Sequence, residues 1–103
     1  IGFFADGKLK RVDVTGGPVV TLADAPDPRG GSWGRDGVIL YTPSADGPIF
    51  RISANGGAPA AATALDTTLA EITHRYPSFL PDGRHFLYLA RRGGAGAGEA
   101  PVI

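Results

Sequence analysis

A turn, a short apolar strand and a second turn occur twice in this chain, forty positions apart. The thirteen residues 5–17 return as 45–57, with apolar side chains conserved between the turns. Six positions are identical, namely Ala5/Ala45, Asp6/Asp46, Gly7/Gly47, Arg11/Arg51, Gly16/Gly56 and Gly17/Gly57. The preserved features are those of a strand and its two bounding turns, so the sequence predicts a repeated structural unit.

A second repeat overlaps the first, because residues 31–37 are echoed forty-six positions later by residues 77–83. A period of about 40 to 50 residues that holds several short strands is typical of β-propeller blades. The sequence therefore predicts an all-β fold, a β-propeller fragment of about two and a half four-stranded antiparallel blades. Its predicted parts are residues 1–30 (strands two to four of one blade, and a linker), 31–73 (a complete blade and its linker) and 74–103 (the start of the next blade).

The length of 103 residues is too short for a closed ring, which normally has four to eight blades. The absence of Met, including at position 1, agrees with a segment of a larger protein. The first expected partners are therefore the remaining blades of the same propeller. We expect the isolated segment to associate or to unfold with little cooperativity, because the blade faces at its two ends have no neighbour.

The middle unit, residues 31–63, is expected to form one antiparallel meander with turns at 36–37, 45–48 and 55–57, since Asp-Gly and Asn-Gly favour hairpin turns. Trp33 and Phe79 hold matching positions in two units, and we expect both to be buried. Within this unit the predicted strands are 31–34, 38–42, 49–53 and 60–63. The last of these is an outer edge strand, as is 19–22 in the preceding unit. Linkers are predicted at 23–30 and 65–75, one helical turn at 67–72 and a loop at 91–99.

Ten Lys plus Arg balance ten Asp plus Glu, so the chain shows no electrostatic footprint for nucleic acid or an anionic membrane. Lys8, Lys10 and Arg11 form a short basic run, interpreted as a solvated strand edge. The absence of cysteine excludes disulfides and thiol catalysis. No run of 18 apolar residues and no signal peptide is present, which for a segment says little about its parent. Contact with a membrane is expected only through the parent chain.

Several motifs that resemble catalytic sites have simpler interpretations as turns. Residues 30–34 match G-x-S-x-G, but a turn and a strand follow Ser32 where a nucleophile elbow needs a helix. The aspartates that precede glycine recur with the hairpins, as turn residues do and a catalytic pair does not. No phosphate-binding loop and no clustered metal ligands are found, so no catalytic residue, metal or cofactor is predicted.

The linkers carry the residues predicted to bind a ligand, since propeller linkers gather on one face where function usually lies. These residues are Arg29, His74 and Arg75. The alternative is that His74 and Arg75 tie neighbouring blades together by hydrogen bonds to loop carbonyls.

Residues 74–88 resemble the strand pair of TolB-type, WD-repeat-like β-propeller repeats. Residues 25–33 and the Asn-Gly-Gly-Ala-Pro stretch at 55–59 resemble a subgroup attached to bacterial serine/threonine protein kinases. In that subgroup a cytoplasmic kinase domain, a membrane-spanning helix and an external propeller share one chain. The resemblance implies a non-catalytic, extracytoplasmic region that senses or binds a protein, peptide or glycan. No kinase motif lies in these residues, and the Gly-His and Trp-Asp signatures of true WD repeats are missing.

Two alternatives stay open: the gating propeller of a prolyl-oligopeptidase-like peptidase, and a TolB-like periplasmic scaffold. The residues that flank this segment in its parent would distinguish them. An upstream kinase domain with a hydrophobic helix, a downstream G-x-S-x-G on a strand-turn-helix, or a signal peptide alone would each favour one of the three.

Overall fold

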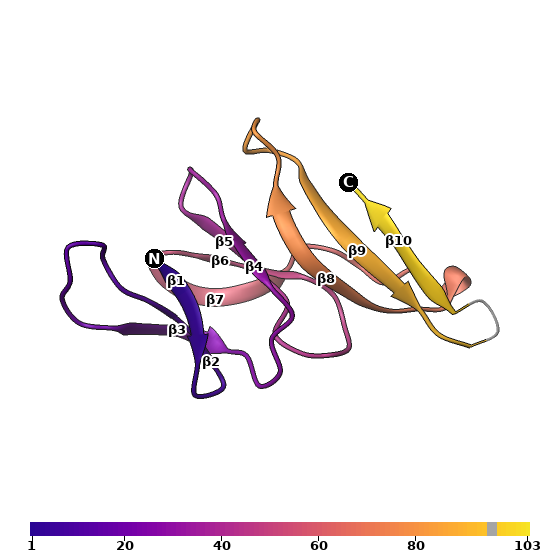
Figure 1. The fold of residues 1–103 in the computed structure, drawn as a ribbon, viewed down its shortest axis with the longest axis horizontal. Helices are drawn as coiled ribbons and strands as arrows, with labels where there is room; N and C mark the ends of the chain where they lie inside the picture. Colours follow the sequence, from indigo (N-terminus) through magenta and orange to yellow (C-terminus); the bar gives the residue numbers. More distant parts are fainter. Residues whose placement is uncertain (95–96) are drawn as a thin grey trace.

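A computed structural model describes residues 1–94 and 97–103, and these form three antiparallel sheets (Figure 1). The all-β fold class predicted from the sequence is confirmed. The first sheet has the order β1-β2-β3, the second β4-β5-β6-β7 and the third β10-β9-β8. The strands are β1 (Gly2–Ala5), β2 (Lys8–Arg11), β3 (Val20–Asp24), β4 (Gly31–Trp33), β5 (Val38–Tyr41), β6 (Phe50–Ser53), β7 (Gly56–Ala61), β8 (Glu71–Phe79), β9 (Phe86–Arg92) and β10 (Gly98–Val102).

The second sheet confirms the predicted four-stranded meander of residues 31–63. Its outer strand begins earlier than expected, because the last turn is centred on Ala54 and Asn55 and the strand starts at Gly56. Gly56 and Gly57 adopt φ values of +98° and +101°, and they enter the strand beside an irregularity in the β6–β7 register. Glycine tolerates this conformation, so the pair marks an irregular strand start where the sequence suggested a turn.

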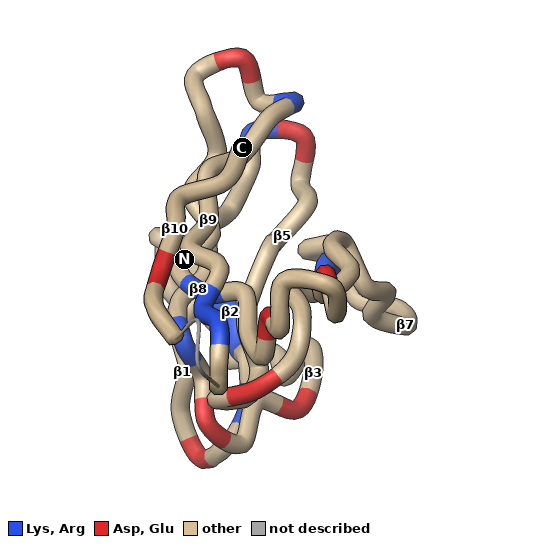
Figure 2. Tube along the Cα trace, turned by 90° about the vertical axis from the view of Figure 1, so that its right-hand side faces the viewer, with Lys and Arg blue, Asp and Glu red and all other residues tan. Residues whose placement is uncertain are grey.

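The first sheet corrects the interpretation of the basic run. Residues Lys8 to Arg11 form β2, the central strand of its sheet, and Leu9 between them is buried. The lysines are paired, Lys8 with Asp24 and Lys10 with Asp6. Figure 2 shows the basic residues along β2 and the acidic residues mainly on the connecting segments. Successive side chains of a strand point to opposite faces of the sheet, and each lysine is paired with a nearby aspartate. A basic run can therefore occupy the central strand of a sheet.

The third sheet begins within the predicted linker, so the linker expected at 65–75 is shorter. Residues Glu71–Phe79 form β8 and pair with β9, and a 3₁₀ turn, η1 (Thr67–Leu69), precedes them. The expected helical turn therefore exists but stops at Leu69. The loop predicted at 91–99 is also shorter, because Arg91 and Arg92 belong to β9 and residues 98–99 to β10. Residues 95–96 of that loop lie outside the described residues.

The core lies between the first two sheets, with Leu9, Ile39, Tyr41 and Ile52 buried against one another. Trp33 is outside it and is 42% exposed, so the prediction that Trp33 is buried is wrong. Phe79, its counterpart in β8, is only half-buried, so its predicted burial is not confirmed either. Both aromatic rings nevertheless lie against a glycine of the preceding sheet. That glycine is Gly2 for Trp33 and Gly34 for Phe79.

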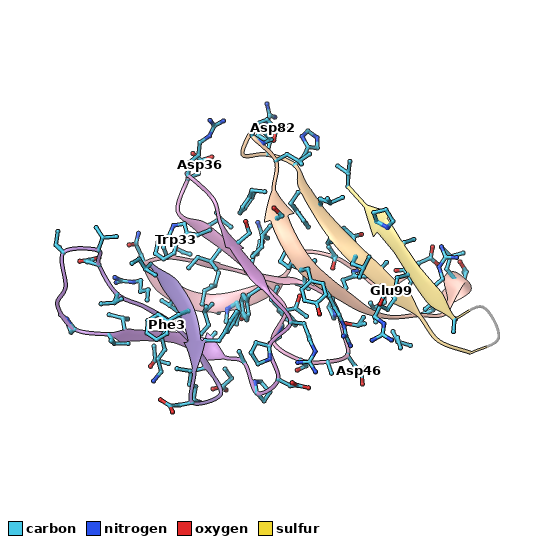
Figure 3. All side chains as sticks on the ribbon, in the orientation of Figure 1. Phe3, Trp33, Asp36, Asp46, Asp82 and Glu99 are labelled. Carbon is cyan, nitrogen blue, oxygen red and sulfur yellow. The ribbon has the colours of Figure 1, made fainter. Side chains whose placement is uncertain are left out.

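The three sheets follow one another along the molecule, which measures 49 × 31 × 19 Å, and within the described residues they close no ring (Figure 1). The turn tips at Asp36 and Asp82 lie on one side of the molecule, and Asp46 lies on the opposite side (Figure 3). Arg35 joins the first two tips, because its guanidinium donates to the carbonyl of Asp82 at 2.6 Å. None of the described helical segments is long and apolar enough to cross a membrane.

Candidate functional site

The chain that follows each of the first two sheets is anchored on an Asp-Gly turn of that sheet. The amide of Ala25 donates to the carbonyl of Gly7 at 2.8 Å, and the amide of His74 donates to the carbonyl of Gly47 at 2.9 Å. Gly7 and Gly47 are matched positions of the forty-residue repeat. The chain that leaves each unit therefore docks on the same turn, and this contact places His74 beside the Asp46-Gly47 turn.

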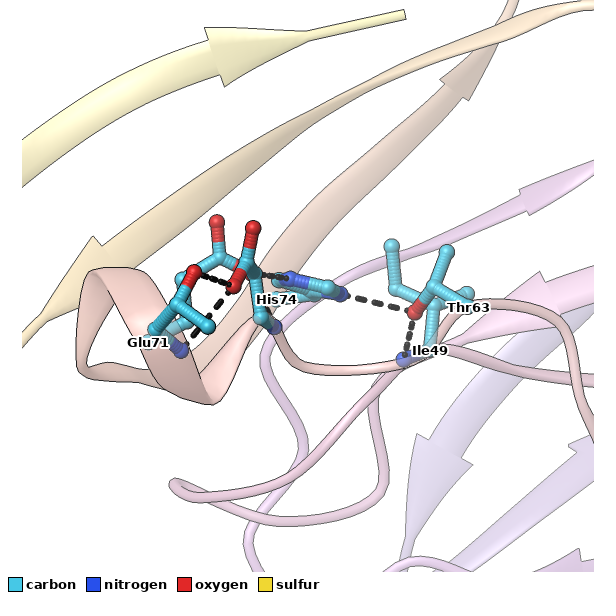
Figure 4. A network of polar contacts seen from close by, with 6 residues as sticks. Ile49, Thr63, Glu71 and His74 are labelled. Carbon is cyan, nitrogen blue, oxygen red and sulfur yellow. Dashed lines mark hydrogen bonds and ion pairs between the residues drawn. The ribbon is translucent and has the colours of Figure 1, made fainter.

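His74 is at the centre of a polar network drawn in Figure 4, and it is only 1% exposed. Its Nε2 lies 2.7 Å from a carboxylate oxygen of Glu71, and its Nδ1 lies 2.8 Å from the hydroxyl of Thr63. The Thr63 hydroxyl also accepts the amide of Ile49 at 3.0 Å. The imidazole thus connects β8 to the segment that follows β7 and, through Thr63, to the residue before β6. It joins the second sheet to the third.

The Glu71 carboxylate can only accept a hydrogen bond, so Nε2 of His74 carries a proton and donates to it. The Thr63 hydroxyl accepts the Ile49 amide and also contacts Nδ1 of the ring. The amide of Asp66 also donates to Glu71, at 2.9 Å. This amide, followed by the His74 ring, lowers the pKa of the Glu71 carboxyl below its ordinary value.

The order hydroxyl, imidazole, carboxylate is also that of an activated nucleophile and its base. In this network the hydroxyl belongs to Thr63 and the carboxylate to Glu71. A substrate would have to reach the Thr63 oxygen, which is engaged by the Ile49 amide, past an imidazole that is almost fully enclosed. Tyr88 closes a further side, since its ring centroid lies 4.7 Å from that of His74. The arrangement is suited to holding two sheets together.

Arg75 reaches the neighbouring sheet, because its guanidinium donates to the carbonyl of Ala45 at 2.8 Å. This is the bond to a loop carbonyl that the alternative interpretation expected. Arg29 occupies the matching place forty-six residues earlier, but its guanidinium turns back to Asp27 at 2.6 Å. The three predicted residues therefore lie at the sheet junctions, where each is engaged by a neighbouring group. A role in ligand binding stays a prediction for Arg29, Arg75 and His74.

Tyr76 is an exposed residue at the same junction, and the sequence had grouped it with His74 and Arg75 as a linker trio that could contact a ligand. It has a φ of +54° and is 55% exposed, and the β8–β9 register is irregular around it. Its amide donates to the carbonyl of Arg29 at 2.9 Å. The matching residue is Gly30, with a φ of +96°, and a Cβ there would lie 3.0 Å from the Cα of Tyr76. A bulky residue held at positive φ with an exposed ring is a candidate contact residue.

The remaining polar motifs are engaged in local structure. The Ser32 hydroxyl, the serine of G-x-S-x-G, accepts the amide of Phe79 at 3.1 Å. The Asp82 carboxylate caps its own turn by accepting the amides of Arg84 and His85, and it also contacts the His85 ring at 2.6 Å. The His85 and Arg84 amides, in that order, and then the ring lower the pKa of Asp82 strongly. Within residues 1–94 and 97–103, no group of three metal-ligating side chains comes together.

Hollows lie between the first and second sheets among the described residues. The wider one, about 480 Å³, has a mostly apolar lining from β3, β5 and β6 and the segments beside them. The pKa of Tyr41 at its wall is raised, first by burial and then by the charge of Asp24. The narrower hollow, about 110 Å³, lies between β1 and β4.

Comparison with known proteins gave no matching family model, no similar curated protein and no similar solved structure.

Proposed function

We propose that this chain is a non-catalytic segment of a TolB-type β-propeller that binds a protein, peptide or glycan on the extracytoplasmic side of a bacterial membrane. In this proposal the parent is a transmembrane serine/threonine protein kinase, and the propeller is its sensory region. The observation that supports the propeller is the succession of antiparallel meanders, in which β8, the first strand of the third sheet, packs against β4 and β5 of the second sheet.

The side chains of the described residues favour binding over catalysis. The hydroxyl of Ser32 and the carboxylate of Asp82 each accept backbone amides, and the imidazole of His74 is enclosed. Groups that are engaged in this way stabilise turns and sheet junctions and are not presented to a substrate. Tyr76 is presented, on a backbone held by its neighbours. Exposed aromatic side chains on a rigid support contribute much of the affinity in protein interfaces.

The kinase, peptidase and scaffold alternatives are separated by the gene sequence on either side of these residues. We expect an upstream kinase domain followed by a hydrophobic helix of about 20 residues. A downstream hydrolase domain with G-x-S-x-G would replace the kinase proposal by the gating propeller of a peptidase. A signal peptide with no further domain would replace it by a periplasmic scaffold.

Binding itself is tested with the intact parent protein. A panel of peptides and cell-wall glycans would be screened, and any hit would be measured again with Tyr76→Ser. We expect this variant to weaken binding at least about tenfold, as removal of an aromatic anchor does. Leu87→Ser is the matched control, because Leu87 is another exposed apolar side chain on the third sheet, 39% exposed. Equal affinities for Tyr76→Ser and the unchanged protein would refute the role of this junction.

A further inference from the structure

The first strands of the second and third sheets, β4 and β8, are joined by a side-chain hydrogen bond. The amide of Phe79 in β8 donates to the hydroxyl of Ser32 in β4 at 3.1 Å. The Phe79 ring covers the end of β4, where a Cβ on Gly34 would lie 2.8 Å from it. A serine in one strand and an aromatic residue in the next thus form a paired contact.

Trp33 occupies in β4 the place that Phe79 occupies in β8. The amide of Gly34 donates to Val38 at 2.8 Å, and the carbonyl of Gly30 accepts from Thr42 at 3.0 Å. Since the backbone groups of successive residues alternate in direction along an antiparallel strand, the Trp33 amide points away from β5. It is oriented as the Phe79 amide is, toward the position where a preceding strand would present a serine.

That position lies beside β1. Ile1 and Val12 form a hydrogen-bonded pair, with the amide of Val12 donating to Ile1 at 2.9 Å. By the same alternation, Phe3 faces β2, whereas the amides of Gly2 and Phe4 point to the outer side of β1. In the described residues β1 is an edge strand of its sheet, whereas β5, its counterpart in the second sheet, is hydrogen-bonded to β4.

The side chains at this edge are arranged for a covering strand. Trp33 lies over Gly2, 3.3 Å from the position of a Cβ there, and yet is 42% exposed. The side chains of Phe4, Trp33 and Ile39 contribute to the lining of the 110 Å³ hollow between β1 and β4. A strand paired with β1 would contact the exposed part of the indole, as the end of β4 contacts the ring of Phe79.

We propose that the outer edge of β1, together with Trp33, binds an extended strand of this same repeat, with the pattern small residue, serine, aromatic residue. The strand lies antiparallel to β1 and forms backbone hydrogen bonds with Gly2 and Phe4. Its serine hydroxyl accepts the Trp33 amide, which repeats the contact between Ser32 and Phe79. This inference rests on the propeller architecture of the proposed function and specifies what that architecture requires at its first sheet.

The test uses residues 1–103, at concentrations where sedimentation shows a monomer, and a synthetic peptide with the sequence of residues 28–36. Amide hydrogen exchange is followed residue by residue as the peptide is added. We expect slower exchange at Gly2, Phe4 and Trp33, while Phe3 and Ala5 serve as internal controls because their amides already face β2. A peptide with alanine in place of its serine should bind about 2- to 12-fold more weakly, the effect of one hydrogen bond.

Three outcomes would overturn the proposal. Exchange at Trp33 could be unchanged, protection could appear only at the edges of β7 or β10, or the alanine peptide could bind as well as the serine peptide. Protection at Gly2, Phe4 and Trp33 that increases with protein concentration in the absence of peptide would identify a second copy as the occupant of this edge and would also overturn the proposal. None of these outcomes depends on Tyr76 or on the parent protein. The edge proposal and the ligand-binding proposal can therefore fail separately.

Discussion

Two histidine–carboxylate pairs of the same spacing offer a controlled measurement of what burial contributes to this fold. His74 lies 2.7 Å from Glu71 and His85 lies 2.6 Å from Asp82, and in each pair the carboxylate precedes the histidine by three residues. The side chains of the first pair are 1% and 9% exposed, and those of the second are 65% and 46% exposed. His74→Ala and His85→Ala therefore remove the same group from two environments.

The expected cost of His74→Ala follows from its contacts. The substitution removes a hydrogen bond to the Glu71 carboxylate, about 1.5–3 kcal/mol, and one to the Thr63 hydroxyl, about 0.5–1.5 kcal/mol. It also leaves space beside the ring of Tyr88. We expect a loss of about 3–5 kcal/mol, a large share of the roughly 5–15 kcal/mol that stabilises a typical domain. His85→Ala should cost only a small fraction of this, because water replaces the contacts of an exposed pair.

Urea unfolding followed by circular dichroism measures both variants. A double-mutant cycle with Thr63→Val and Glu71→Gln then shows whether the network acts as a unit, since residues in one network give non-additive losses. Equal shifts of the unfolding midpoint for His74→Ala and His85→Ala would refute the reasoning. So would strictly additive effects of Thr63→Val and Glu71→Gln, because the imidazole would then not couple them.

Three further outcomes are expected from single substitutions. The Glu71 carboxyl has a lower pKa in the folded protein than its unfolded pKa of about 4.5, so its ionised form stabilises the fold above that pH. This stabilisation is lost as the pH falls through the folded-state pKa, and Glu71→Gln should therefore flatten the acid limb of a stability–pH curve. Gly34→Ala should destabilise by about 1–3 kcal/mol because the new Cβ meets Phe79, whereas Gly98→Ala, with open space around it, should be neutral in thermal unfolding. Trp33→Ala should cost about 1–2 kcal/mol, less than a fully buried aromatic residue, and a loss above about 3 kcal/mol would show that the indole is covered in solution.

Local sequence was sufficient to predict the hairpins. Asp6 and Gly7 both adopt positive φ, as a two-residue Asp-Gly hairpin turn requires. Gly37 and Gly83 close equivalent turns, with amides that donate to Gly34 and Leu80 at 3.1 and 2.9 Å. These turns depend on the conformational preferences of two or three adjacent residues. The sequence carries such preferences directly, and the strands and the all-β class follow from them.

The sheet junctions were not determined locally. His74 was identified as a linker residue, but its partners Thr63 and Glu71 were not, because no pattern in an amino-acid sequence indicates which hydroxyl and which carboxylate will meet an imidazole. The exposure of Trp33 was also missed, since its position in the repeat matches that of Phe79 and only the neighbouring strands differ. Burial and polar pairing depend on residues brought together from distant parts of the chain. The sequence determined how each unit turns and pairs, and the tertiary structure decided which side chains the packed units enclose.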